Sequence, residues 1–122
     1  MNNRRIYTVE EANAALPRLR LLVGQQMERS SAMDRAAASR DAPRYAELVR
    51  EYEEGWRDVE AMGVVVKDPR IGLCDFYGRV DGRLVFLCWK YGEETVAHYH
   101  DIDAGFAGRK PLVGAPARAL LN

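Results

Sequence analysis

Apolar positions recur every three or four residues through the first half of the chain, which is the period of an amphipathic helix. Thr8 and Glu11 form a capping box, which is typical of a helix start. The stripe that follows contains Leu19, Val23, Gln26, Ser30, Met33 and Ala37. Pro17 lacks a backbone N–H and crowds the preceding turn. We therefore predict a short helix over residues 9–15, a break or kink near Leu16, and a long helix from Pro17, where proline suits the first turn.

A second amphipathic stretch follows Asp41 and Pro43, which indicate a turn and a new helix start. Its apolar face carries Tyr45, Leu48, Val49, Tyr52, Trp56, Val59 and Met62. Gly63 suits the position after a helix end. Two helices joined by a short loop form an antiparallel hairpin, so the pattern predicts a helical hairpin over residues 8–62.

Residues 63–102 change to the pattern of short strands. Asp81 and Gly82 lie between two apolar runs, and this dipeptide is the strongest short-range signal for a type I′ hairpin turn. A two-residue turn at this point pairs Asp75 with Cys88 across the hairpin. The sequence therefore predicts an antiparallel β-meander of three to four strands.

A second tight turn at Gly92 and Glu93 would pair Leu87 with His98. Residues on one face of the sheet would then be Cys74, Phe76, Val85, Leu87, Trp89, Val96, His98 and His100. The opposite face would hold Leu73, Asp75, Tyr77, Leu84, Phe86, Cys88, Ala97 and Tyr99. Both faces are largely apolar, so a sheet with helices on one side predicts a homodimer or a covering C-terminal segment.

The fold class is therefore α+β, with the helical hairpin packed on the meander. Glycines and prolines break up residues 103–122, which we predict to be an ordered loop with a terminal turn at 117–121. The chain has 122 residues, and this length favours a single domain.

Composition limits the partners. The 18 Lys and Arg residues balance 18 Asp and Glu residues, so the electrostatic attraction that nucleic acids and anionic membranes require is missing. No apolar run approaches the roughly 20 residues that span a bilayer. With only two cysteines and no secretory signal pattern, we expect a cytoplasmic protein without nucleic-acid or membrane partners.

Four separated segments carry a family resemblance: YTVEEANAALPRLR, GVVVKDPRIGLCDF, DGRLVFLCWKYGEE and HDIDAGFAGRKPL. Together they resemble the bacterial family named domain of unknown function 2203, over about residues 6–112. The resemblance implies a bacterial, cytoplasmic protein. It implies no activity and no catalytic residue, because the family is uncharacterised.

The sharpest chemical signal is the His98-Tyr99-His100 segment. Residues two apart in a strand share a face, so the two imidazoles can supply two ligands to Zn²⁺, Ni²⁺ or Fe²⁺. A third ligand would come from Asp75, Glu93, Asp101, Asp103 or the Glu10-Glu11 pair. Hydrogen-bonded structural histidines explain the same pattern, and no other cofactor is predicted.

Two further charged residues extend this candidate site. Asp75 lies within an apolar strand and needs a partner, for which Arg79, Lys90, Arg109 or a backbone donor is available. Arg109 in the glycine-rich loop can bind a carboxylate, either that of Asp103 or one on a small anionic ligand. The supporting polar cluster is thus Asp75, Glu93, Asp101, Asp103 and Arg109.

Two hypotheses for the function follow. The first is a non-enzymatic interaction or assembly module that forms a homodimer through the long helical hairpin. The alternative is a small metal- or anionic-ligand-binding protein, or a metalloenzyme, that uses His98 and His100 with nearby carboxylates.

Overall fold

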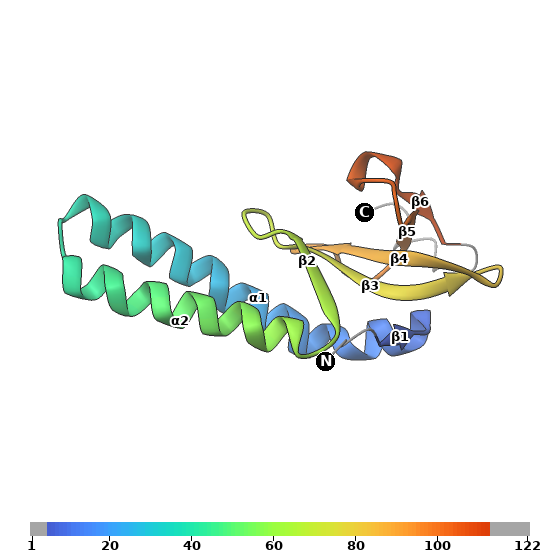
Figure 1. Ribbon diagram of the computed structural model, residues 1–122, viewed down its shortest axis with the longest axis horizontal. Helices are drawn as coiled ribbons and strands as arrows, with labels where there is room; N and C mark the ends of the chain where they lie inside the picture. The colour runs from blue at the N-terminus through green and yellow to red at the C-terminus, as the bar shows by residue number, and fades with distance from the viewer. Residues whose placement is uncertain (1–4, 113–122) are drawn as a thin grey trace.

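The computed structural model describes residues 5–112, which form a helical hairpin and a twisted sheet (Figure 1). The elements, in chain order, are β1 (Ile6–Tyr7), α1 (Val9–Ala38), α2 (Ala42–Glu60), β2 (Val64–Asp68), β3 (Leu73–Val80), β4 (Arg83–Lys90), β5 (His98–Asp101), the 3₁₀ turn η1 (Phe106–Gly108) and β6 (Lys110–Pro111). The predicted α+β class and the helical hairpin are confirmed. The predicted turn at 117–121 lies outside the described residues.

Helix α1 is continuous from Val9 to Ala38, so the predicted separation into two helices by a break near Leu16 is wrong, and the alternative of a kink stays a prediction. The capping box is present, since the Glu11 N–H donates to Thr8 Oγ1 and the Thr8 N–H donates to the Glu11 carboxylate. Pro17 lies inside the helix and removes one backbone hydrogen bond. Leu16, the residue before Pro17, is buried in the hydrophobic core between the helices and the sheet. Packing of the apolar face of α1 against the core keeps the chain helical at Pro17, because these tertiary contacts outweigh the tendency of proline to end a helix.

The hairpin turn matches the sequence pattern. Asp41 is the N-cap of α2, with its carboxylate accepting from the Arg44 N–H at 3.1 Å, and a proline follows in the first turn. Gly63 follows the helix end with a φ of 82°, which glycine adopts without steric cost. The two helices approach closely at Gly55, which is buried against Gln26.

The sheet has the order β1-β3-β4-β5-β6, and β2 also pairs with β3. All pairings are antiparallel except that of β1, which lies parallel to β3. Asp81 and Gly82 both have positive φ, as the predicted turn requires. The pairing of Asp75 with Cys88 is confirmed. Strand β1 and strand β6, which begins within the predicted loop segment, were not predicted, and each has only two residues.

The predicted register between β4 and β5 is wrong by one residue. Leu87 pairs with Tyr99, and Cys88 pairs with His98. Residues 91–97 form a longer connection, and the Val96 N–H donates to Asn13 Oδ1 on α1 at 2.8 Å. A shift of one residue moves every side chain of a strand to the other face. Both histidines of β5 therefore lie on the face that carries Asp75 and Cys88.

The two faces of the sheet have different neighbours. The helices cover one face, where a core forms from Ala12, Leu16, Leu19, Val23, Val59, Cys74, Phe76, Val85, Leu87 and Trp89. The opposite face is also buried at its centre, with Leu73, Asp75, Phe86, Cys88 and His100 each at most 7% exposed. The helical hairpin extends well beyond the sheet (Figure 1). No helix among residues 5–112 is both long and apolar enough to span a bilayer.

Candidate functional site

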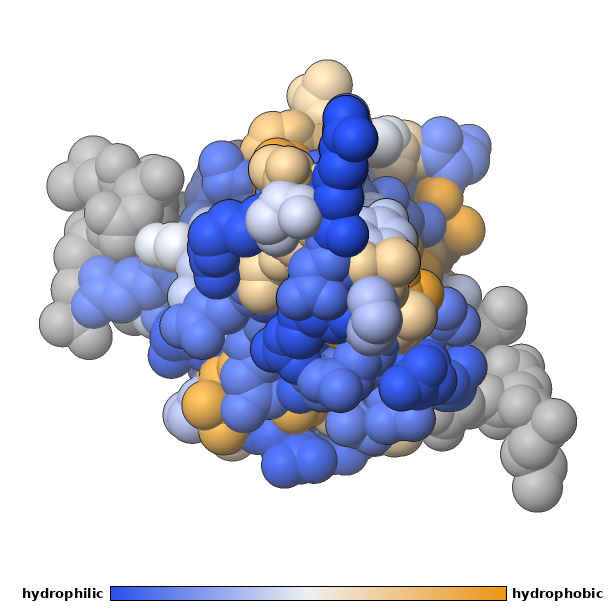
Figure 2. Space-filling view, turned by 90° about the vertical axis from the view of Figure 1, so that its left-hand side faces the viewer, coloured by the Kyte–Doolittle hydropathy of each residue, from blue (hydrophilic) through white to orange (hydrophobic). Residues whose placement is uncertain are grey.

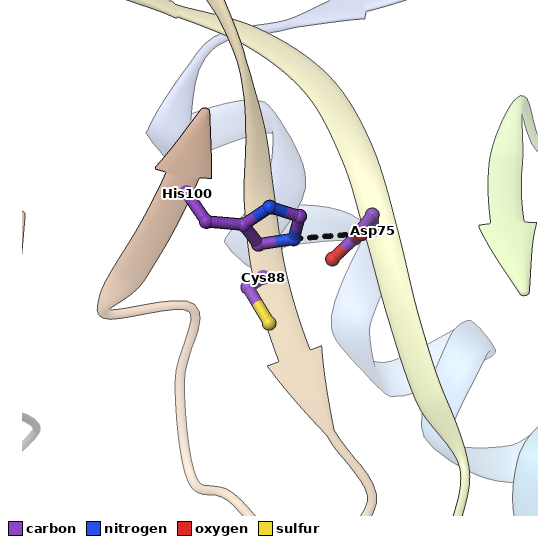
Figure 3. A group of neighbouring side chains, drawn as sticks. All are labelled: Asp75, Cys88 and His100. Carbon is purple, nitrogen blue, oxygen red and sulfur yellow. Dashed lines mark hydrogen bonds and ion pairs between the residues drawn. The ribbon is translucent and has the colours of Figure 1, made fainter. Parts of the chain in front are cut away.

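Three side chains of different chemistry meet on the sheet face that the helices leave uncovered. Asp75 projects from β3, Cys88 from β4 and His100 from β5, and the imidazole reaches over β4 toward the carboxylate (Figure 3). One ligand atom from each residue lies within 4.8 Å of the other two. Asp75 and Cys88 are 0% exposed and His100 is 3% exposed. The group is therefore isolated from bulk water.

Both ring nitrogens of His100 have partners. Nδ1 lies 2.9 Å from the Asp101 carbonyl oxygen, and Nε2 lies 2.9 Å from Asp75 Oδ2. A carbonyl only accepts, so Nδ1 carries a proton and donates it. A second proton lies between Nε2 and Oδ2 and belongs either to the imidazole or to the carboxylic acid. In both cases the pair has no net charge, which suits a site without water.

Burial dominates the electrostatics of the site. It raises the pKa of Asp75, although the His100 ring, the Cys88 thiol and the Lys67 ammonium act in the opposite direction. Burial and the negative charge of Asp75 also raise the pKa of Cys88 to about 12. The second carboxylate oxygen, Asp75 Oδ1, is buried and has no hydrogen-bond partner within residues 5–112. A buried acceptor without a partner destabilises the fold unless something binds it.

The arrangement does not suit nucleophilic catalysis. A reactive cysteine needs a lowered pKa and a base with a free lone pair. The pKa of Cys88 is raised, and both nitrogens of His100 already contact Asp75 and the Asp101 carbonyl. The Cys88 thiol interacts with the Asp75 carboxylate instead, and this hydrogen bond raises the thiol pKa further.

The same three groups do suit a transition metal. Thiolate, imidazole and carboxylate are the three protein ligands of Zn²⁺. Ligating histidines usually donate their other ring N–H to a carbonyl or carboxylate, as His100 does to Asp101. Tetrahedral coordination at ordinary bond lengths separates ligand atoms by about 3.3–3.6 Å. The 2.9 Å contact between His100 and Asp75 would have to widen by about half an ångström, and ligand atoms at the 4.8 Å limit of the group would have to approach by about 1.2 Å.

A second polar cluster lies beside the first. Arg109 forms two hydrogen bonds with the Glu93 carboxylate, at 2.7 and 2.9 Å, and its predicted partner Asp103 is instead exposed. Burial opposes the ionisation of Glu93, but the hydrogen bonds from Arg109 and from the Lys90 N–H leave its pKa lowered. Burial and the Arg109 charge lower the pKa of His98. The charges that act on His98 are therefore those of Arg109 and Glu93.

The remaining predicted residues lie apart from the buried group. The Asp101 side chain is 40% exposed and forms ion pairs with Arg83 at 3.2 Å and Lys110 at 3.8 Å. Asp75 binds His100 rather than any of the arginines or lysines that the sequence offered. Cys88 was not predicted as a site residue. Its pairing with Asp75 was predicted, but the wrong register of β5 placed His100 on the other face.

These observations define an α+β protein with a buried Asp–Cys–His group on the sheet face opposite its helices. The chain belongs to the family described as "Uncharacterized conserved protein (DUF2203)", whose model matches residues 5–112. This membership confirms the resemblance seen in the sequence. No curated protein and no solved structure matches the chain.

Proposed function

We propose that this protein binds a divalent transition metal, Zn²⁺ foremost, through a carboxylate oxygen of Asp75, Sγ of Cys88 and Nε2 of His100. The observation that carries the proposal is the convergence of these three buried ligand atoms within 4.8 Å. Asp75 Oδ1, which has no hydrogen-bond partner among residues 5–112, and the oriented His100 ring give independent support. The proposal concerns binding, and it assigns no catalysed reaction.

The ligand types favour some ions over others. A soft thiolate beside an imidazole favours Zn²⁺ or Co²⁺ over Mg²⁺ and Ca²⁺, which prefer sets of oxygen ligands. A divalent ion would displace the proton shared by Asp75 and His100 and the thiol proton of Cys88. Two positive charges leave as two arrive, so the buried site stays neutral. Metal affinity should therefore increase with pH, as it does for other thiolate sites.

The test is a Co²⁺ titration of untagged, chelator-treated protein, followed by the sulfur-to-cobalt charge-transfer absorption. We expect one equivalent to bind, and Zn²⁺ to displace it. Cys88→Ser should remove the charge-transfer band, and His100→Gln should weaken binding at least tenfold. His98→Gln is the matched control, since it changes a histidine two residues away on the same strand face. Equal losses in both histidine variants, or no band in the wild type, would contradict the proposal.

The predicted assembly role remains a second candidate. The helical hairpin beyond the sheet leaves helix surface without a third layer, and this favours pairing with a second copy. A hollow of about 320 Å³ at its end is lined by Ala36, Ala37, Arg40, Asp41, Ala42 and Tyr45. Sedimentation at micromolar concentration tests the homodimer. A dimer that Tyr45→Glu dissociates supports the role, and a monomeric wild type contradicts it.

We also propose a bacterial, cytoplasmic setting. Cys74 and Cys88 are both free and buried, which supports a reducing compartment. A reduced thiol at Cys88 is also what metal binding requires.

A further inference from the structure

The ion pair between Glu93 and Arg109 is largely buried, whereas most ion pairs of small proteins are exposed to solvent. Arg109 Nη1 lies 2.7 Å from Glu93 Oε2, and Nη2 lies 2.9 Å from Oε1. The two side chains are only 15% and 13% exposed. A bidentate, enclosed pair has a fixed geometry, unlike an exposed pair whose long side chains move.

Glu93 attaches this pair to the end of β4. Its Oε1 accepts from the Lys90 N–H at 2.8 Å, and its own carbonyl accepts from Trp89 Nε1 at 3.0 Å. Arg109 Nη2 also points to the Cys88 carbonyl, at 3.5 Å. Three consecutive residues of β4, beginning with the proposed ligand Cys88, are thus tied to one ion pair.

Arg109 attaches the same pair to the far side of β5. It immediately precedes β6, which pairs with β5 at His98 and Tyr99. Its guanidinium also lies 4.7 Å from the Phe106 ring centre in η1. The guanidinium therefore links the β6 side of β5 to the Cys88 backbone on β4. Strand β5, which carries His100, is held between these two attachments.

We infer that Arg109, held by Glu93, is a positioning residue for the metal site: it fixes Cys88 on β4 relative to His100 on β5. This inference rests on the proposed function. Arg109 touches the backbone of Cys88 and none of the three ligand atoms, so it acts through the ligands. Such outer contacts typically change metal affinity by 10–100-fold.

The experiment compares Co²⁺ affinity and the sulfur-to-cobalt band in the wild type, Arg109→Gln, Arg109→Lys and Glu93→Gln. We expect about 10–100-fold weaker binding and a weaker band in Arg109→Gln. Arg109→Lys, which keeps the charge but not the bidentate geometry, should recover part of the affinity. Arg70→Gln is the matched control, because Arg70 also forms paired hydrogen bonds with a carboxylate, Asp68, but at the β2–β3 turn.

The outcomes separate the two proposals. Weakened binding in folded Arg109→Gln with unchanged binding in Arg70→Gln supports the positioning role. Wild-type affinity and an unchanged band in folded Arg109→Gln overturn the positioning role and leave the metal site intact. No cobalt binding by the wild type overturns both. If Arg109→Gln does not fold, Glu93→Gln decides by the same criteria, since it keeps the side-chain shape and removes the negative charge that holds Arg109.

Discussion

The outer half of the helical hairpin and the centre of the sheet are stabilised in different ways. Helix α1 has 30 residues and is about 45 Å long. Over its outer part, beyond the sheet, it packs only against α2 (Figure 1). Viewed from its end, the hairpin is covered mainly by hydrophilic residues with scattered apolar ones (Figure 2). Strands β3 and β4, by contrast, carry buried side chains on both faces, including Asp75 and Cys88, and the buried His100 of β5 lies beside them.

This contrast indicates where chemistry can be expected. On the solvated hairpin, charged residues meet water and need no fixed partner, so their identity has little effect on stability. In the sheet, each polar group must find a partner or bind something from outside. Within the described part of the chain, residues 5–112, only one of the two carboxylate oxygens of Asp75 has a hydrogen-bond partner. The difference also predicts how substitutions in the two regions should behave.

The largest expected effect is at Asp75. Asp75→Ala leaves buried His100 without its Nε2 partner and should lower the free energy of unfolding by about 2–4 kcal/mol, as measured in urea. Asp75→Asn should retain most of the stability, because the amide can donate to Nε2 while Nδ1 keeps its proton. Metal binding should be lost in both variants. If Asp75→Ala were as stable as the wild type, polar groups in the sheet would not need partners, and the difference between the sheet and the helical hairpin would be contradicted.

The hairpin has one position where it should be as sensitive as the sheet. A Cβ at Gly55 would lie 2.5 Å from Gln26 Cδ and closer still to Oε1, and Gln26 is fully buried with its amide bonded to the Tyr52 carbonyl. Gly55→Ala should therefore cost about 1–3 kcal/mol, although alanine favours helix by about 1 kcal/mol.

Gly24→Ala is the matched control within α1. The three atoms nearest to its Cβ would all belong to Tyr91, with the hydroxyl closest at 3.0 Å, and this residue is 39% exposed and free to shift. We expect unchanged or slightly greater stability in urea unfolding. A loss at Gly24 equal to that at Gly55 would contradict the close helix approach.

The smallest effect concerns the pH dependence of Glu93. Its pKa is lowered from 4.5, so the ion pair stabilises the fold above that pH, and this contribution is lost as the pH falls below it. Glu93→Gln should cost about 1 kcal/mol at pH 7 and flatten the decline in stability as the pH falls below 4.5. The contribution of Asp75 to stability changes with pH in the opposite direction and increases as the pH falls, because its pKa is raised from 3.8. Urea unfolding across this range, with a slope unchanged by Glu93→Gln, would contradict the assignment.

Interactions between neighbours in the sequence determined several features. Thr8 and Glu11 specify the start of α1, and Asp81 with Gly82 specifies the β3–β4 turn and hence the pairing of Asp75 with Cys88. Each depends on residues at most a few positions from the turn or cap. Local geometry is therefore sufficient to predict them.

Only the tertiary structure decided the rest. The β4–β5 register depends on a connection anchored by Asn13 to Val96, two residues 83 positions apart, and no local pattern encodes that contact. That register brings His100 to Asp75 and Cys88, although the sequence shows His98 and His100 as the obvious pair. Successive side chains of a strand point to opposite faces of the sheet. A loop longer or shorter by one residue therefore decides which side chains lie on the same face and can meet.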